Sequence, residues 1–166
     1  ILNGEDEDDQ FGISVASAGD FNGDGKGDVI VGAHEDDNNG DASGSAFIFF
    51  GGITGTKGAD DADVILDGQD NTDQFGTSVA SAGDFNGDGK GDVIVGAPQD
   101  DNNSAGNSGS AFIFFGGITG TKRADDADVI LNGQDNGDKL GISVASAGDF
   151  NGDGKGDVIV GAYFDD

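Results

Sequence analysis

A block of sequence that recurs at a nearly fixed interval constrains this chain more than any other feature. The stretch that begins at Phe11 begins again at Phe75 and a third time at Leu140, at offsets of 64 and 65 residues. The first two copies differ over their first 23 residues only at Ile13 against Thr77. A repeat of this length predicts an array of similar structural units, each of which packs against the next.

The repeat divides the chain into four parts. Residues 11–74 and 75–139 are two complete units, and residues 140–166 are the first part of another. Residues 1–10 match the end of a unit, because they resemble residues 130–139. The chain therefore runs from the end of one unit, through two whole units, into the first part of another unit.

Each complete unit contains four short strand-like runs and no helical periodicity. In the first unit these runs are residues 13–18, 29–31, 47–50 and 64–66. The second and third runs are continuously apolar, which indicates strands that are covered on both faces. The first run is rich in small residues, which suits a crowded centre. A β-sandwich or a β-solenoid remains an alternative on this pattern alone.

We therefore expect an all-β fold of β-propeller blades with four antiparallel strands each. Residues 11–74 form blade 1 and residues 75–139 form blade 2. Residues 1–10 are expected to be the outer strand and connection of a preceding blade, and residues 140–166 the inner half of a third blade. Two complete blades are thus flanked by partial blades at both ends.

The charge of the chain limits its partners. Asp and Glu number 33 against 7 Lys and Arg, a formal net charge of -26. Nucleic acid and anionic membrane surfaces are excluded as ordinary partners because both would be repelled. No apolar run approaches the roughly 18 residues of a membrane span, so we expect no membrane insertion. The strong negative charge instead favours cations as partners. The chain has no Cys, so no disulfide stabilises the fold.

The nine residues DFNGDGKGD occur three times, as loop 1 (Asp20–Asp28), loop 2 (Asp84–Asp92) and loop 3 (Asp149–Asp157). Oxygen-bearing side chains stand at positions 1, 3, 5 and 9, and the Gly at position 6 allows a sharp turn that directs the carbonyl of position 7 inward. Five hard oxygen ligands suit Ca²⁺. The expected ligands are Asp20, Asn22, Asp24, Lys26 (carbonyl) and Asp28; Asp84, Asn86, Asp88, Lys90 (carbonyl) and Asp92; and Asp149, Asn151, Asp153, Lys155 (carbonyl) and Asp157.

Other readings of the loops fit less well. Mg²⁺ favours octahedral geometry with several retained waters, and Zn²⁺ favours His and Cys, which the loops do not contain. An EF-hand needs Glu at position 12, where loop 1 has Val31. An ordinary acidic hairpin turn would explain one such loop. Three copies with every oxygen position unchanged favour the metal site.

These residues also carry a family resemblance. Phe75-Gly76, loop 2 and Gly96-Ala97-Pro98 resemble the FG-GAP repeat of integrin α-subunit propellers and related bacterial surface proteins. The resemblance extends over nearly the whole chain. It implies four-stranded blades with Ca²⁺ as cofactor, about one per repeat and three in this chain, in the loop between the first and second strands.

The copies depart from the family pattern at a few positions. The first copy has His34 and the third has Tyr163 where the second has Pro98, and Leu140 replaces the Phe. None of these changes removes an expected ligand.

Catalysis has little support in the sequence. The chain has one His and no Cys, so a nucleophilic triad is not supported, and carboxylate pairs are too abundant to be informative. We expect a non-catalytic, calcium-stabilised extracellular repeat protein that acts in adhesion, matrix, surface-layer or filament assembly. Extracellular modules of this kind bind calcium near the millimolar range. The alternatives are a carbohydrate- or protein-binding lectin-like propeller and an accessory domain of an enzyme, and near-identical copies also fit a designed consensus.

The ends of the array suggest its partners. Two blades and two fractions cannot close a ring unaided, and each terminal blade leaves an apolar flank and an open strand edge. We expect these ends to join other copies of the chain, or further blades of a longer chain, head to tail. A remaining hypothesis concerns Asp67, Asp70 and Asp73, which with residues 34–41 form either further cation sites or a solvated acidic surface.

Overall fold

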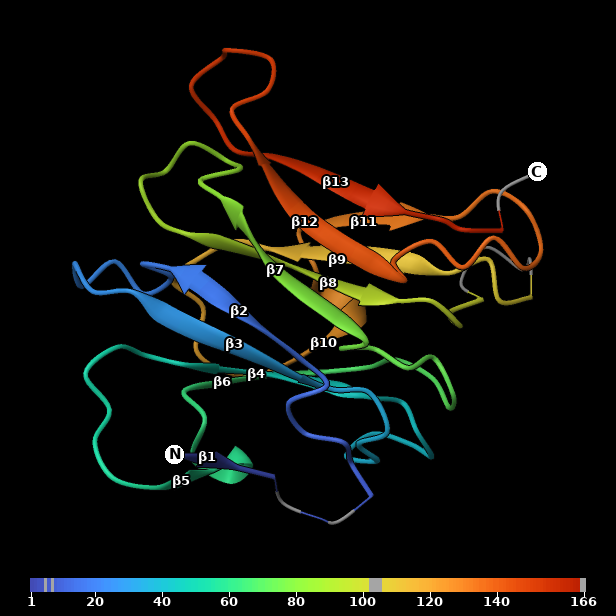
Figure 1. The fold of residues 1–166 in the computed structure, drawn as a ribbon, viewed down its shortest axis with the longest axis horizontal. Coiled ribbons are helices and arrows are strands. Elements are labelled where there is room, and N and C mark those ends of the chain that lie inside the picture. The colour runs from blue at the N-terminus through green and yellow to red at the C-terminus, as the bar shows by residue number, and fades with distance from the viewer. Residues whose placement is uncertain (5, 7, 102–105, 165–166) are drawn as a thin grey trace.

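The computed structural model describes residues 1–4, 6, 8–101 and 106–164. Its strands form four sheets, and three of these, each built mainly from one repeat, lie side by side (Figure 1). The predicted all-β fold of propeller-type blades is confirmed. Residues 102–105, which belong to the connection between the second and third strands of blade 2, and the last two residues of the third repeat lie outside the described residues.

Blade 1 and blade 2 have the same antiparallel meander. In blade 1 the strands are β2 (Ser14–Gly19), β3 (Asp28–Ala33), β4 (Ser45–Phe49) and β6 (Val64–Asp67). In blade 2 they are β7 (Ser78–Gly83), β8 (Asp92–Ala97), β9 (Ser110–Phe114) and β11 (Val129–Asn132). The third repeat contributes β12 (Ser143–Gly148) and β13 (Asp157–Gly161), paired antiparallel. Every residue of β4 and β9 is buried, as their continuously apolar sequences predicted.

A fifth strand joins neighbouring blades at the outer edge and was not predicted. β10 (Gly120–Arg123) leaves blade 2 between β9 and β11 and pairs parallel with β6 of blade 1. In blade 1, β5 (Lys57–Gly58) occupies the equivalent place and pairs parallel with β1 (Leu2–Asn3). Each is followed by a single 3-10 turn, η1 (Ala59–Asp61) or η2 (Ala124–Asp126). β10 is polar and largely exposed, so its sequence has no strand-like alternation.

The hydrophobic core lies between the blades. One cluster fills the space between blade 1 and blade 2 and includes Ile30, Phe75 and Val79, all nearly or fully buried. The ring of Phe75 lies 5.5 Å from that of Phe112 and 6.3 Å from that of Phe114. A second cluster between blade 2 and the third repeat includes Ile94 and Val144. Each blade therefore contributes one apolar face to each of its neighbours.

Among the described residues, the outermost faces of the array are covered only in part: on blade 1, Leu2 and Phe11 pack against a buried cluster that includes Phe47. Val15, the counterpart of the buried Val79, is 67% exposed on the outer face of blade 1. Ile159, the counterpart of the buried Ile94, is 62% exposed on the outer face of the third repeat. Among the described residues, no helix has the length and apolar character needed to cross a membrane.

Candidate metal centre

The three acidic loops occupy equivalent places in successive blades. Loop 1 joins β2 to β3, loop 2 joins β7 to β8, and loop 3 joins β12 to β13. They follow one another along the same edge of the molecule, at the upper left of Figure 1. A register shift near the end of the first strand of each pair, as between Ser17 and Gly19, precedes the loop and turns the chain away from the sheet.

Short polar side chains fix the loop conformation. In loop 1, Asn22 Oδ1 accepts a hydrogen bond from the Asp24 amide (2.8 Å), and Asp24 Oδ1 accepts one from the Lys26 amide (2.9 Å). Asp20 Oδ2 accepts one from the Gly25 amide (2.9 Å). Gly23 and Gly25 have φ values of 77° and 86°, a conformation that favours glycine. The sequence therefore specifies a tight loop of successive Asx-type turns.

Loops 2 and 3 repeat this arrangement. The amide of position 5 donates to the Asn of position 3, at 2.7 Å in loop 2 and 2.8 Å in loop 3. The amide of position 6 donates to the Asp of position 1, at 2.9 Å and 3.0 Å. The residues concerned are Asp84, Asn86, Asp88 and Gly89 in loop 2, and Asp149, Asn151, Asp153 and Gly154 in loop 3. The same sequence thus adopts the same conformation three times.

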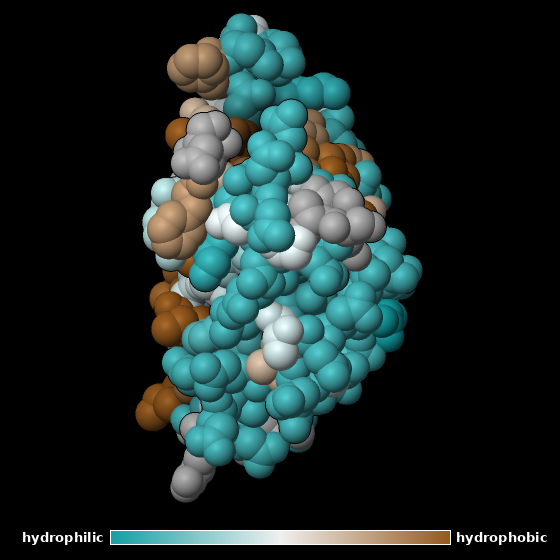
Figure 2. Space-filling model, turned by 90° about the vertical axis from the view of Figure 1, so that its right-hand side faces the viewer, coloured by the Kyte–Doolittle hydropathy of each residue, from teal (hydrophilic) through white to brown (hydrophobic). Residues whose placement is uncertain are grey.

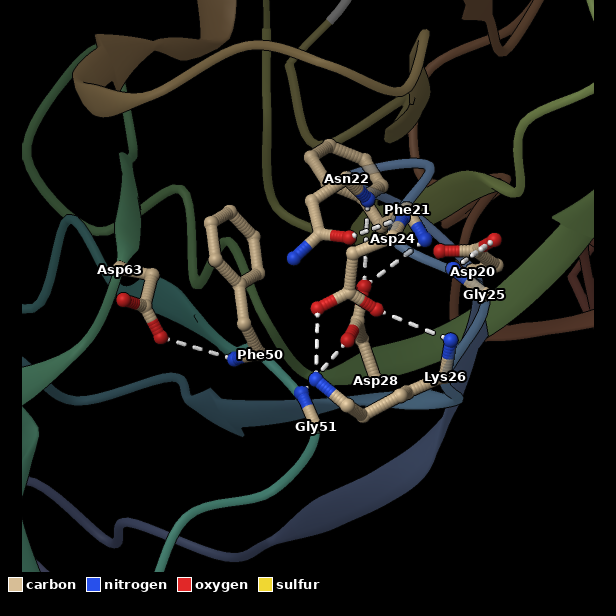
Figure 3. Close-up of polar contacts among 10 residues, drawn as sticks. All are labelled: Asp20, Phe21, Asn22, Asp24, Gly25, Lys26, Asp28, Phe50, Gly51 and Asp63. Atoms are coloured by element: carbon tan, nitrogen blue, oxygen red, sulfur yellow. Dashed lines mark hydrogen bonds and ion pairs between the residues drawn. The ribbon is translucent and has the colours of Figure 1, made fainter.

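The Asp at position 9 anchors each loop to the sheet. Asp28 is 1% exposed; its Oδ2 accepts hydrogen bonds from the amides of Phe21 (2.8 Å) and Asn22 (3.2 Å). Its Oδ1 accepts one from the amide of Gly51 (2.7 Å), which lies in the turn after β4 (Figure 3). Asp92 makes the equivalent three bonds in blade 2, and Asp157 makes the two within loop 3. Position 9 is therefore a structural residue as well as an expected ligand.

The electrostatic environment differs between exposed and buried positions. Hydrogen bonds from the Lys26 ammonium and amide lower the pKa of the exposed Asp24 below its usual value. In loop 2, hydrogen bonds from the Lys90 amide and the Asn86 side chain lower the pKa of Asp88. Burial raises the pKa of Asp92, despite its three backbone donors. The exposed carboxylates are thus held in the ionised form that a cation requires.

The residues of loop 1 fit a calcium ion in their chemistry. All expected donors are hard oxygens, and Asp20 Oδ1 is buried with no hydrogen-bond partner. A buried oxygen without a partner is unfavourable unless another group satisfies it, and Ca²⁺ is such a group. Within the part of the chain that the structure describes, however, no three His, Cys, Asp or Glu side chains converge as a metal-holding group. Each loop brings its expected ligands onto one turn, and the ligand set stays a prediction.

The opposite edge of the blades carries a second acidic region, which faces the viewer in Figure 2, where hydrophilic residues cover the middle and lower part of the view. Asp6, Asp9, Glu35 and Asp41 are among the residues lining a hollow of about 550 Å³ there. This surface agrees in part with the predicted solvated acidic region. The prediction of further cation sites in this region stays a prediction.

Several aspartates in this region are buried, which sequence reasoning missed. Asp36 and Asp73 are 3% and 5% exposed, and Asp100 and Asp138 are also buried. Burial, together with the negative charge of nearby Asp100, raises the pKa of Asp73 to about 7. Burial also raises the pKa of Asp36, whose Oδ1 accepts hydrogen bonds from Asn38 and Ser45. The sequence contains one indication of this burial, because Asp36 recurs as Asp100 and Asp73 recurs as Asp138 in the next repeat.

Comparison with known proteins adds family evidence. The model of the FG-GAP repeat matches residues 11–49, 75–114 and 140–166. Each matched segment contains one of the three loops and the strands on either side of it.

Proteins similar to this chain include a phospholipase D and integrin alpha subunits. The chain is 32% identical over 161 residues to phosphatidylinositol-glycan-specific phospholipase D of Bos taurus, covering 93% of this chain and 19% of that protein. It is 31% identical over 171 residues to integrin alpha-5 of Xenopus laevis (98% and 15%) and 32% identical over 167 residues to integrin alpha-IIb of Mus musculus (98% and 16%). The chain therefore spans less than a fifth of the length of these relatives.

Proposed function

Because this chain belongs to the FG-GAP repeat family, we propose that it is a non-catalytic β-propeller segment whose blades are stabilised by Ca²⁺ in loops 1, 2 and 3. The observation that carries the proposal is the threefold recurrence of one loop conformation with unchanged oxygen positions. The buried, unpartnered Asp20 Oδ1 adds a direct reason for a cation.

The residues of each loop have distinct roles in this proposal. Positions 1, 3 and 5 and the carbonyl of position 7 would supply oxygens, and position 9 would supply a carboxylate already fixed by backbone amides. A bound Ca²⁺ supplies positive charge among three carboxylates that otherwise repel one another. Because the chain carries a net charge of -26, the positive charge of a bound cation should stabilise these loops.

A non-catalytic role is supported by the distribution of polar chemistry. The three loops are copies of one another, whereas a catalytic site is usually a single asymmetric cluster. His34 lies against Glu35 at 3.7 Å, and the sequence holds no other His and no Cys. One named relative is a phospholipase, but the chain matches only 19% of it. We assign this chain a role in adhesion, matrix or surface-layer construction, outside the cell, where calcium is near millimolar.

The outer faces of the array suggest what it joins. The exposed Val15 and Ile159 occupy positions that are buried between blades elsewhere in the chain. Another FG-GAP blade, from a longer chain or a second copy, offers the complementary surface to each of them. No nucleic acid or membrane partner is proposed, given the strong negative charge.

Isothermal titration with CaCl₂, after removal of metal with a chelating resin, tests the proposal. We expect three Ca²⁺ per chain, and Asp88→Ala should reduce this number to two by removing a ligand of loop 2. Absence of heat and of bound ⁴⁵Ca²⁺ at millimolar calcium would contradict the proposal. Lys57→Ala is a matched control, because Lys57 lies on the outer edge of the blade and contacts no loop ligand in the described structure.

A further inference from the structure

The three loops are joined to one another through the backbone. The amide of Gly91, at position 8 of loop 2, donates a hydrogen bond to the carbonyl of Asp20, at position 1 of loop 1 (2.9 Å). The amide of Gly156 in loop 3 donates to the carbonyl of Asp84 in loop 2, also at 2.9 Å. Each bond joins the first expected ligand of one loop to the residue between the last two expected ligands of the next.

The loops also approach closely where these bonds form. A Cβ at Gly91 would lie 2.6 Å from the carbonyl oxygen of Ala18 and 3.0 Å from the amide nitrogen of Asp20. Gly156 meets the carbonyl of Ala82 in the same way. A Cβ at Gly27, at the same position of loop 1, would have no neighbouring atom within 4 Å. Position 8 is therefore sterically restricted only where a preceding loop lies beside it.

The lysine at position 7 extends the contact. The side chain of Lys90 lies against Gly23 of loop 1, and that of Lys155 lies against Gly87 of loop 2. Lys26 has no described loop before it, and its ammonium group instead pairs with Asp24 of its own loop at 3.1 Å. In loops 2 and 3, a lysine side chain thus packs against the preceding loop.

We propose that adjacent calcium loops are coupled through these contacts, so that Ca²⁺ bound in one loop raises the affinity of the next. This inference rests on the proposed calcium binding and deepens it. Fixing Asp20 in loop 1 also fixes Gly91, because the two share a hydrogen bond, and Gly91 lies between the expected ligands Lys90 and Asp92. Part of the ordering that loop 2 requires is then already complete, which produces positive cooperativity.

The geometry makes the coupling depend on adjacency. Loop 2 contacts both other loops, whereas the described contacts include no hydrogen bond between loop 1 and loop 3. Gly91 and Lys90 are therefore positioning residues for loop 1, and Gly156 and Lys155 for loop 2. We expect each filled loop to strengthen binding in its neighbour about fivefold, at the lower end of usual coupling.

Single-loop knockouts test this directly. Asp24→Ala and Asp153→Ala each leave two adjacent loops, and Asp88→Ala leaves two loops that are not adjacent. Titrations are made in an osmolyte in which circular dichroism shows each metal-free variant to be folded. We expect a Hill coefficient above 1 for the two adjacent pairs and of 1 for Asp88→Ala. Equal Hill coefficients in all three variants would overturn the coupling through contacts.

A matched pair of glycine variants locates the coupling. In the Asp153→Ala background, Gly91→Ala should separate loop 1 from loop 2 and reduce the Hill coefficient to 1. Gly27→Ala changes the same loop position where there is open space, and should leave the coefficient unchanged. An equal effect of both variants would assign the result to damage within a loop and would overturn the inference.

Amide exchange supplies a second measurement that does not depend on binding isotherms. In the Asp88→Ala variant, loop 2 holds no Ca²⁺, yet calcium bound in loop 1 should slow hydrogen exchange at the Gly91 amide severalfold. Unchanged exchange at Gly91 while loop 1 fills would overturn the coupling alone. Absence of any calcium binding would instead overturn the proposed function, so the two failures are distinguishable.

Discussion

Gly32 of blade 1 lies directly against the backbone of Gly76 of blade 2. A Cβ at Gly32 would overlap the carbonyl oxygen of Gly76, and the same holds for Gly96 against Gly141 in the next pair of blades. The glycine that follows Phe75 or Leu140 therefore meets the glycine of the Gly-Ala pair of the preceding blade across the blade boundary. Their close approach lets neighbouring blades exclude water from the core between them.

The first prediction follows from that contact. Gly32→Ala should lower the free energy of unfolding by about 2–3 kcal/mol, because a methyl group must push two backbones apart. Gly161→Ala is the matched control at the equivalent position of the third repeat, where the nearest atom to a Cβ is 3.6 Å away. Urea denaturation of both variants in saturating calcium checks the difference. Equal stability of the two would show that the close approach is unimportant.

Chelation should strongly destabilise the protein. With a site affinity near 0.1 mM and about 1 mM calcium, linkage contributes roughly 1.4 kcal/mol per site and about 4 kcal/mol for three. This is a large share of the stability of a small domain. Differential scanning calorimetry in excess EDTA should therefore show a Tm many degrees lower than in calcium. Mg²⁺ should restore little of the loss, and an identical melt in EDTA would contradict the expectation.

Two aspartates of loop 2 should separate metal binding from folding. Asp92→Ala leaves the amides of Phe85, Asn86 and Gly116 without their acceptor, so it should cost about 2–4 kcal/mol even in EDTA. Asp88 is exposed and accepts hydrogen bonds from the Lys90 amide and the Asn86 side chain. Because water can replace it there, Asp88→Ala should cost much less than Asp92→Ala in EDTA while lowering the gain from calcium. Unfolding curves with and without calcium distinguish the two. Similar losses in EDTA would show that position 9 is not the anchor of the loop.

The sequence allowed most of the blade to be predicted. The runs 13–18, 29–31, 47–50 and 64–66 correspond to β2, β3, β4 and β6, because buried strands in this fold are continuously apolar or composed of small residues. β10 could not be predicted, since it is a polar strand whose partner, β6, belongs to the preceding blade. Strand pairing of this kind is decided by tertiary arrangement and leaves no local pattern.

The candidate site was predictable in its composition and not in its supports. Repetition identified positions 1, 3, 5 and 9 of each loop as oxygen donors. The hydrogen bond from Gly51 to Asp28 joins residues 23 positions apart, and the bond from Gly91 to Asp20 joins different repeats. Neither follows from spacing within a loop. The burial of Asp36 and Asp73 was indicated only by the recurrence of both residues in the next repeat, because both stand in sequences as acidic as the exposed surface.

Asp73 should make the protein more stable in mild acid than in base. Its pKa in the folded chain is raised to about 7, above the usual value of 3.8. The stability associated with its neutral form is fully present below pH 4 and is lost as the pH rises through 7. Between pH 5 and pH 8 this group should contribute a loss of about 2–3 kcal/mol.

Asp73→Asn provides the test of this pH dependence. The amide cannot ionise and keeps an oxygen to accept the hydrogen bond from the Asp70 amide (2.9 Å). The variant should therefore lack this loss, so its stability relative to the parent should increase between pH 5 and pH 8, measured by urea denaturation in EDTA. Asp60→Asn, which changes an exposed aspartate of η1 that is not among the charges acting on Asp73, is the control and should retain the pH dependence of the parent. A parallel pH dependence in parent and Asp73→Asn would assign the effect elsewhere.

The outer faces of the array should support head-to-tail contact between chains. Val15 is 67% exposed on one face and Ile159 is 62% exposed on the other, whereas their counterparts Val79 and Ile94 are buried against neighbouring blades. Residues 1–166 in millimolar calcium should therefore associate, as measured by light scattering. Val15→Asp and Ile159→Asp each remove one of the two faces, so each variant alone should remain a monomer of 16.5 kDa.

Mixing these two variants distinguishes a head-to-tail contact from a symmetric one. Val15→Asp retains the face of the third repeat and Ile159→Asp retains the face of blade 1, so the mixture should form a heterodimer that cannot grow further. A symmetric contact between identical faces would instead leave one single variant able to dimerise by itself. Ile53→Asp changes an exposed residue in the turn after β4 and should associate like the parent. Monomers in the mixture as well as in the parent would refute the contact, because each retained face would then have met its complement without binding it.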